Sequence, residues 1–233
     1  GDTGEATVSA SSLTFTAANW DTPQTVTVTG VDDNIIDGNQ NTTITMSVDD
    51  DNSDNNFDAL ANQTVTATTV DNDTAGFTLG AISGTVTEAG STATFTVVLD
   101  AQPDSNVVIS VTSADTGEVT VSAAELTFTN GNWDTPQTVT LTGVDDDVID
   151  VDTQTTVTMS VKDASSDDNF DGVSDQTVTV TTTDNDTAGF TLSSTTATVT
   201  EAAGGGNTAT YTVVLNAQPD SDVVITVTSA DTG

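Results

Sequence analysis

The chain has 233 residues and carries 36 acidic side chains against a single basic one, Lys162, which gives a formal net charge of −35. So negative a surface repels nucleic acid and anionic membranes, and no run of about 20 apolar residues is present to span a bilayer. Histidine and cysteine are absent, so the usual serine, cysteine and zinc chemistries have no base or soft ligand. We therefore expect no enzyme, no nucleic-acid partner and no direct membrane insertion.

The sequence repeats itself with a period of 113 residues. The stretch DNDTAGFTL at 71–79 recurs at 184–192, and NWDTPQTVT at 19–27 recurs at 132–140. A period this long equals a whole small domain. We therefore expect residues 1–75 to be the C-terminal part of one repeat, 76–187 a complete repeat, and 188–233 the N-terminal part of the next, as an excerpt of a much longer protein.

Threonine and valine alternate through nearly every ordered stretch, which is the pattern of half-buried antiparallel strands. In the complete repeat the pattern predicts strands, in chain order, over 77–87, 92–99, 107–112, 119–128, 138–144, 155–161 and 176–182. On the second strand we expect Ala93, Phe95, Val97 and Leu99 to point inward. Seven strands are typical of an immunoglobulin-like domain. The expected fold class is thus all-β, as tandem seven-stranded antiparallel sandwiches.

Acidic residues gather in the turns at one end of this predicted sandwich. If the strands run alternately up and down, the first, third and fifth turns and the end of the seventh strand fall at the same pole. These places hold Glu88, Asp115, Asp145, Asp146, Asp147, Asp150, Asp184 and Asp186. Such carboxylates repel one another unless cations bind between them, and calcium is the hard ion that carboxylate oxygens bind. A solvated acidic surface is the alternative, because aspartate also favours turns.

Several motifs in this repeat resemble the Calx-beta domain, the calcium-binding sandwich of sodium/calcium exchangers that also occurs in tandem in very large bacterial surface adhesins. They are V-T-E-A at 86–89, V-D-D-D-V-I-D at 144–150 and D-N-D at 184–186. The resemblance implies calcium ligands at Glu88, Asp115, Asp145, Asp146, Asp150, Asp184 and Asp186. In the partial repeats it implies Asp32, Asp33, Asp37, Asp71 and Asp73 on the N-terminal side, and Glu201 and Asp231 on the C-terminal side. Asp150 stands where a longer glutamate is usual and Asn185 replaces an acid, so the number of ions per repeat stays open.

These observations predict a calcium-stiffened structural extender in a very large extracellular surface protein, either an adhesin or a filament. Its expected partners are neighbouring repeats of the same protein, head to tail, with self-assembly into fibres as a further option. A carbohydrate- or protein-binding adhesion module is the alternative, although few aromatic and no free basic groups are available for it. The D-T-G triplets resemble the aspartic-protease signature, but successive copies lie a whole repeat apart and cannot meet at one centre.

Overall fold

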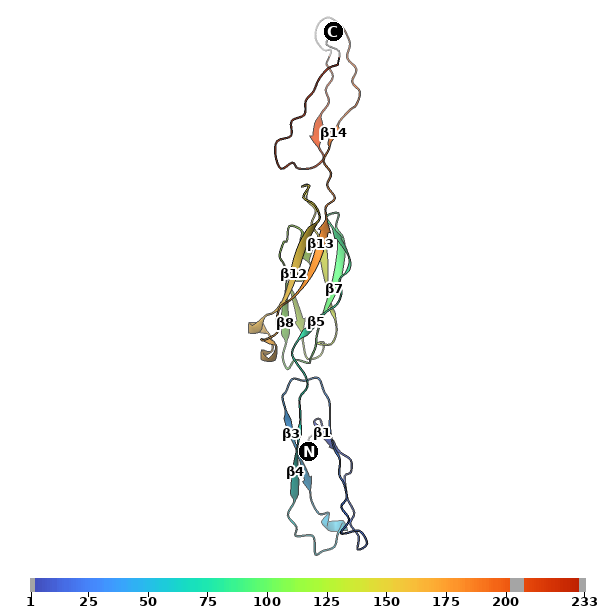
Figure 1. Cartoon of the computed structure of the whole chain (residues 1–233), viewed down its shortest axis with the longest axis vertical. Helices are drawn as coiled ribbons and strands as arrows, with labels where there is room; N and C mark the ends of the chain where they lie inside the picture. Colours follow the sequence, from blue (N-terminus) through green and yellow to red (C-terminus); the bar gives the residue numbers. More distant parts are fainter. Residues whose placement is uncertain (1–2, 202–207, 231–233) are drawn as a thin grey trace.

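The computed structural model describes residues 3–201 and 208–230, and its regular structure is almost entirely β-strand. Figure 1 shows a chain drawn out along one axis, with a large sheet in the middle and smaller sets of strands towards either end. Helical structure in these residues is limited to short 3-10 turns. None of them has the length and apolar character that crossing a membrane requires. The all-β prediction is therefore confirmed.

The central sheet has nine strands and is built from residues 77–183. Its elements are β5 (Phe77–Leu79), β6 (Ser83–Thr87), β7 (Ser91–Leu99), β8 (Val107–Ser113), β9 (Val119–Val121), β10 (Glu125–Phe128), β11 (Gln137–Gly143), β12 (Thr153–Val161), η2 (Asp163–Ser165), η3 (Asp168–Phe170) and β13 (Gln176–Thr183). The order across the sheet is β10-β8-β12-β13-β6-β7-β11-β9, with β5 also paired to β7. The faces of β7 and β11 share one core with those of β8 and β12, so the sheet closes on itself as a sandwich.

The prediction of seven strands is corrected to nine, because two of the predicted strands are each divided into two shorter ones. The stretch predicted at 77–87 divides into β5, which pairs with the end of β7, and β6, which pairs with the start of β7 and with β13. The stretch predicted at 119–128 divides into β9 on β11 and β10 on β8. The β6–β13 pair is parallel, so the sheet is not purely antiparallel. β9 and β10 thus pair with different strands, whereas β5 and β6 share β7 and β6 gains β13 as a second partner.

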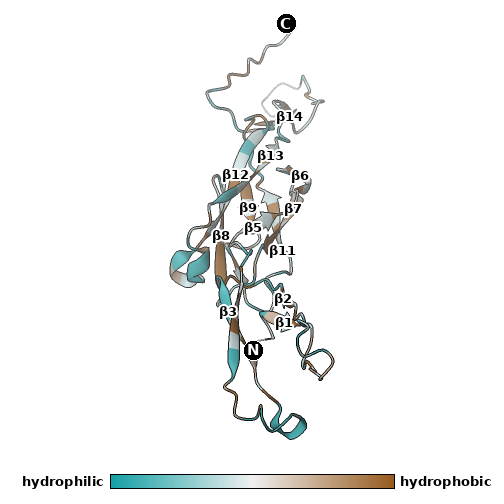
Figure 2. Ribbon diagram, turned by 60° about the horizontal axis from the view of Figure 1, so that its bottom comes forward, coloured by the Kyte–Doolittle hydropathy of each residue, from teal (hydrophilic) through white to brown (hydrophobic). Residues whose placement is uncertain are grey.

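Alternating apolar residues of the central strands form one core. Ala93, Phe95, Val97 and Leu99 on β7 are at most 3% exposed, which confirms their predicted inward direction. β8, β11 and β12 show the same alternation of buried and half-buried residues. Figure 2 shows the apolar character of β8 in brown. Phe170 on η3 is fully buried and belongs to the same core.

In the residues that the structure describes, the two flanking segments form two-stranded sheets. They comprise β1 (Ala6–Val8) with β2 (Val28–Gly30), β3 (Gln40–Met46) with β4 (Gln63–Thr69) beside the turn η1 (Asp50–Asn52), and β14 (Phe190–Leu192) with β15 (Val213–Leu215). Many of their apolar side chains are exposed, among them Phe57 (55%) and Val224 (86%). A two-stranded sheet buries little apolar surface, which leaves these side chains uncovered.

The same backbone contacts join the central body to each flanking segment. Gln102 N donates to the carbonyl of Asn34 at 2.7 Å, and Gln218 N donates to that of Asp147 at 2.6 Å. An isolated parallel bridge accompanies each bond, between Ile35 and Gln102 and between Val148 and Gln218. Asn34 and Asp147 stand at equivalent positions of the sequence repeat. The two joints are therefore formed by loops at equivalent positions of the sequence repeat.

Candidate metal centre

One pole of the central sandwich brings the end of β6 beside the loop that follows β11. Gly143, the last residue of β11, lies so close to Thr87 that a Cβ atom there would clash with the carbonyl oxygen of Thr87. Only glycine permits this approach. Glu88 follows directly on Thr87, and the acidic run that begins at Asp145 follows on Gly143. The close approach therefore sets two acidic segments against each other.

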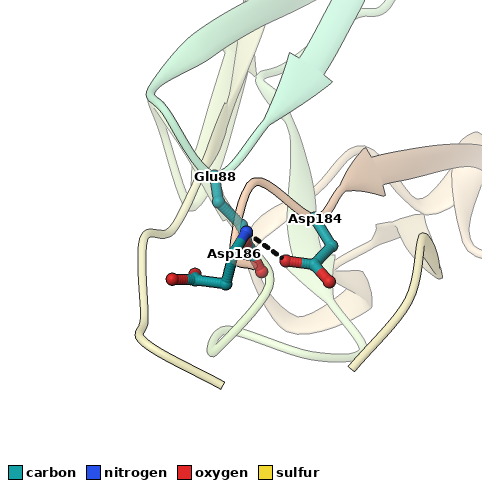
Figure 3. Close-up of side chains that lie close together, drawn as sticks. All are labelled: Glu88, Asp184 and Asp186. Atoms are coloured by element: carbon teal, nitrogen blue, oxygen red, sulfur yellow. Dashed lines mark hydrogen bonds between the residues drawn. The ribbon is translucent and has the colours of Figure 1, made fainter. Parts of the chain in front are cut away.

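Carboxylates from three loops meet around Glu88. Two groups have oxygen atoms that all lie within 4.8 Å of one another: Glu88 with Asp184 and Asp186, and Glu88 with Asp146 and Asp150. Figure 3 shows the first group, with Glu88 reaching towards the loop after β13 that carries the two aspartates. Glu88 belongs to both groups and is only 2% exposed. The geometry allows one carboxylate to be shared by two neighbouring cations.

Backbone and amide donors hold these carboxylates in place. Asn185 N donates to Glu88 Oε2 at 3.1 Å, and Asn185 Nδ2 donates to Asp145 Oδ1 at 3.0 Å. Asp186 N donates to Asp184 Oδ1 at 2.7 Å. Asn185, which replaces an acid at the centre of D-N-D, thus ties the β13 loop to both acidic segments. Its backbone and side-chain N–H groups thus hold two carboxylates in place.

Some oxygen atoms at this pole are buried without any partner. Oδ1 of Asp150 and Oδ2 of Asp186 accept no hydrogen bond and are shielded from solvent. A buried, unpaired carboxylate oxygen is costly, and native proteins satisfy such atoms with donors, water or ions. The donor set is oxygen alone, as a hard cation such as calcium requires. The residues therefore fit the predicted ion.

The electrostatics of the pole are unfavourable as long as it holds carboxylates alone. Burial raises the pKa of Glu88 above its ordinary value, with further contributions from Asp184, Asp146 and Asp150, although the hydrogen bond from Asn185 opposes the shift. Burial, followed by the charge of Asp184, likewise raises the pKa of Asp186. Each shift means that the folded chain resists ionising these groups. A divalent cation would remove the resistance.

Glu118 is a residue of this pole that the sequence analysis did not select. It precedes β9, is 9% exposed, and has a pKa raised by burial and then by the charges of Asp150 and Asp115. The motif D-T-G-E carries it, and the same motif places Glu5 at the equivalent position 113 residues earlier. That repetition was the available signal. The sequence analysis overlooked this signal because Glu118 directly precedes the strand predicted over 119–128.

Two predicted ligands lie at the pole but outside both carboxylate groups. Asp115 is exposed, and its Oδ1 accepts a hydrogen bond from Gly117 N at 2.9 Å, which shapes the turn ahead of β9. Asp145 contacts the β13 loop through Asn185. The structure thus brings five of the seven predicted ligands of this repeat together, namely Glu88, Asp146, Asp150, Asp184 and Asp186.

The N-terminal segment carries an equivalent acidic pole. A hollow there is lined by Glu5, Asp32, Asp33, Asp37, Asp71 and Asp73, among other residues. Burial and the charge of Asp71 raise the pKa of Asp73, as for its counterpart Asp186. In the C-terminal segment Glu201 is exposed, and Asp231 lies outside the described residues. The five acids predicted on the N-terminal side therefore line one hollow.

Comparisons with known proteins give only distant likenesses. No family model matches this sequence, and no curated protein matches it. An MSP-domain protein like family member of Caenorhabditis elegans is 17% identical over 43% of this chain and 91% of that chain, with a TM-score of 0.29. Pilin SafA of Salmonella enterica, solved with its chaperone SafB, is 10% identical over 47% of this chain and 54% of that chain, at 0.30. Domains 1–6 of the surface layer protein SbsC are 19% identical over 66% of this chain and 24% of that chain, at 0.30. Such scores carry no argument about function, so the Calx-beta resemblance stays a prediction.

Proposed function

We propose that this chain is a calcium-binding structural extender of an extracellular surface protein, with no catalytic role. The observation that carries the proposal is that one loop serves both the acidic pole and the joint. Asp146 belongs to a carboxylate group, Asp147 accepts the hydrogen bond from the next segment, and Val148 makes the bridge to it. An ion held by Asp146 restrains the backbone that makes the joint. Calcium then stiffens the row of repeats.

The first joint supports the same reasoning. Ile36 packs against the central core, and Asn169 Nδ2 donates to the Ile36 carbonyl at 3.3 Å. Ile36 lies between Asp33 and Asp37 of the N-terminal acidic hollow. Ion-binding side chains and contact residues therefore alternate within a few positions. Loss of the ion should therefore loosen the loop and, with it, the contact that the loop makes with the central body.

The alternative, a module that binds sugar or protein, has less support. Trp133 packs against the central core, and its carbonyl accepts a hydrogen bond from Leu99 N at 3.1 Å. Its role is thus that of an anchor for the loop. Trp20, its counterpart 113 residues earlier, is 71% exposed, and we assign it the same anchoring role because it stands in the same N-W-D-T-P-Q turn.

Solution scattering with and without calcium tests the proposal on the whole chain. We expect the largest dimension and the stiffness of the particle to increase when calcium is added to the chelated protein. Asp146→Asn should abolish most of that change, whereas Asp104→Asn, an equal loss of charge on an exposed turn, should not. Scattering curves that superimpose with and without calcium would refute stiffening by the ion. If Asp146→Asn still stiffens on addition of calcium, the ion that causes stiffening does not bind at Asp146.

A further inference from the structure

Three loops lie together at the end of the central body that meets the N-terminal segment. They are the turn between β7 and β8, the loop between β10 and β11, and the segment of η2 and η3. Asn130 Nδ2 donates to the Pro103 carbonyl at 3.2 Å, and Leu99 N donates to that of Trp133 at 3.1 Å, so the first two loops are joined. Ala101 and Pro103 in the turn are buried. The turn therefore has a fixed place at this end of the sandwich.

Asp167 holds the third loop to the same turn. It is only 5% exposed, and both of its carboxylate oxygens accept hydrogen bonds, Oδ2 from Ser105 N at 2.8 Å and Oδ1 from Asn169 N at 3.0 Å. Asp167 N in turn donates to the carbonyl of Asn106 at 2.9 Å. A buried carboxylate is costly unless it is paired or hydrogen-bonded, and these bonds meet that requirement. The turn and η3 thus form one ordered surface.

The loop of the preceding segment contacts both parts of this surface. Gln102 N in the turn donates to the Asn34 carbonyl at 2.7 Å, and Asn169 Nδ2 on η3 donates to the Ile36 carbonyl at 3.3 Å. The side chain of Ile36 packs against the central core. Two polar contacts therefore hold an apolar side chain of one segment against the core of the next.

This apolar contact has the same direction at both joints. Among the residues that the structure describes after 187, none belongs to the central core or packs against it, whereas Ile36 from the preceding segment does. Ile149 stands 113 residues after Ile36, and it lines a hollow with Phe190 and Leu215 of the following segment. Each isoleucine therefore lies against the segment that comes next in the chain.

We propose that each repeat completes the core of the repeat that follows it, through the isoleucine at position 36 or 149. The inference goes beyond the proposed function, because an apolar contact does not require an ion. In a row of repeats, stability is the sum of each repeat's own stability and the contacts between neighbours. A contact of this kind makes the core of a repeat depend on its preceding neighbour and hardly on its following one.

Thermal unfolding of the whole chain in calcium, followed by tryptophan fluorescence, tests the direction. Trp20→Phe first leaves Trp133, which packs against the central core, as the one tryptophan that reports on the central body. In this background we expect Ile36→Ala to lower the midpoint by roughly 5 °C or more, although position 36 lies outside the central body. Ile149→Ala is the matched control, since it makes the same change at the equivalent position, and it should lower the midpoint by less than half as much. Equal shifts, or a larger shift for Ile149→Ala, overturn the inference.

Disulfides across the two joints give a second measurement that removes no core side chain, since the natural chain has no cysteine. Ile35 and Gln102 form a bridge at the first joint, and Val148 and Gln218 form the equivalent bridge at the second. Cysteine pairs at these positions enclose loops of similar length, so loop closure alone should stabilise both chains alike. We expect oxidation of the first pair to raise the Trp133 midpoint more than oxidation of the second. A first pair that fails to close, or equal increases from both pairs, would contradict the proposed direction.

Discussion

At position 118 a glutamate carboxylate is buried among other acids, and this placement predicts opposite effects with and without calcium. In the chelated protein, Glu118→Gln should raise the free energy of unfolding, because it removes a charge that burial and neighbouring aspartates disfavour. In calcium the same change should weaken ion affinity by about tenfold, since it removes a negative charge beside the carboxylate groups. Urea unfolding in the two conditions measures both effects. A decrease in chelator would show that the carboxylate is stabilised by protein groups alone.

Asp184→Asn should weaken calcium binding more than Asp145→Asn, and both more than Asp104→Asn. Asp184 has its carboxylate in a group with Glu88, whereas Asp145 contacts the pole through Asn185. Each substitution removes one charge, so a ranking cannot come from global electrostatics. Calorimetric titration of calcium into the three variants gives the order. Equal affinities would mean that the acids act only as diffuse surface charge.

The raised pKa values of Glu88, Glu118 and Asp186 predict how the unfolding free energy depends on pH. Without metal, the folded chain binds more protons than the unfolded chain between the ordinary pKa values, 4.5 for the glutamates and 3.8 for the aspartate, and the raised ones. The unfolding free energy should therefore fall as the pH rises through that window. Calcium requires deprotonated ligands, so the slope should reverse when it is present. Denaturation across this range in chelator and in calcium checks the sign.

At the scale of the loop between β11 and β12, one residue has an unfavourable backbone conformation. Val151 has a φ of 75°, in the left-handed region that a β-branched side chain rarely adopts, whereas its counterpart in the N-terminal segment is Gly38, with a φ of 70°. Val151→Gly should therefore raise the unfolding free energy by roughly 1 kcal/mol, since the side chain is 74% exposed and contributes little packing. Thermal denaturation measures the change, with Val148→Gly at the joint as a destabilising control. A lower melting temperature for Val151→Gly would show that the valine is not strained.

Sequence alone predicted the long strands of the central body well. Alternating threonine and valine locates β7, β8, β11, β12 and β13 to within two residues, because each keeps one buried face along its whole length. The pattern could not show where β5 passes to β6 or β9 to β10. A break between two such strands changes their backbone hydrogen bonds. It leaves the alternation of side chains along the sequence almost intact.

The acidic pole was predictable for a similar reason and within a similar limit. Alternating strand directions place the loops after β6, β11 and β13 together, so Glu88 and the aspartates of those loops could be grouped in advance. The acids inside the carboxylate groups differ from the exposed Asp115 in their burial. Burial depends on contacts between segments that are far apart in the sequence. The contact of Gly143 with Thr87 is an example, because nothing in the local sequence indicates it.

For the molecule as a whole, the main expectation is that calcium governs stability. Binding only to the folded form adds about 2.7 kcal/mol per site at a hundredfold excess of ion over the dissociation constant. Removal of calcium should therefore lower the melting temperature markedly, all the more because the chain has no disulfide to compensate. Scanning calorimetry in calcium and in chelator measures the shift. Magnesium, which prefers a rigid octahedral shell, is the control and should restore less. Identical melting curves in calcium and chelator would contradict the calcium assignment.

The repeated joint has a geometric consequence. Both joints have the same kind of hydrogen bond and bridge, Gln102 to Asn34 and Gln218 to Asp147 for the hydrogen bonds. We therefore expect them to repeat the same rotation and the same advance along the axis. A constant rotation applied again and again turns a row of bodies into a screw with a fixed pitch. Oriented fibres built from such a row should diffract into discrete layer lines, and their spacing would report the angle that the loop of Asp147 imposes.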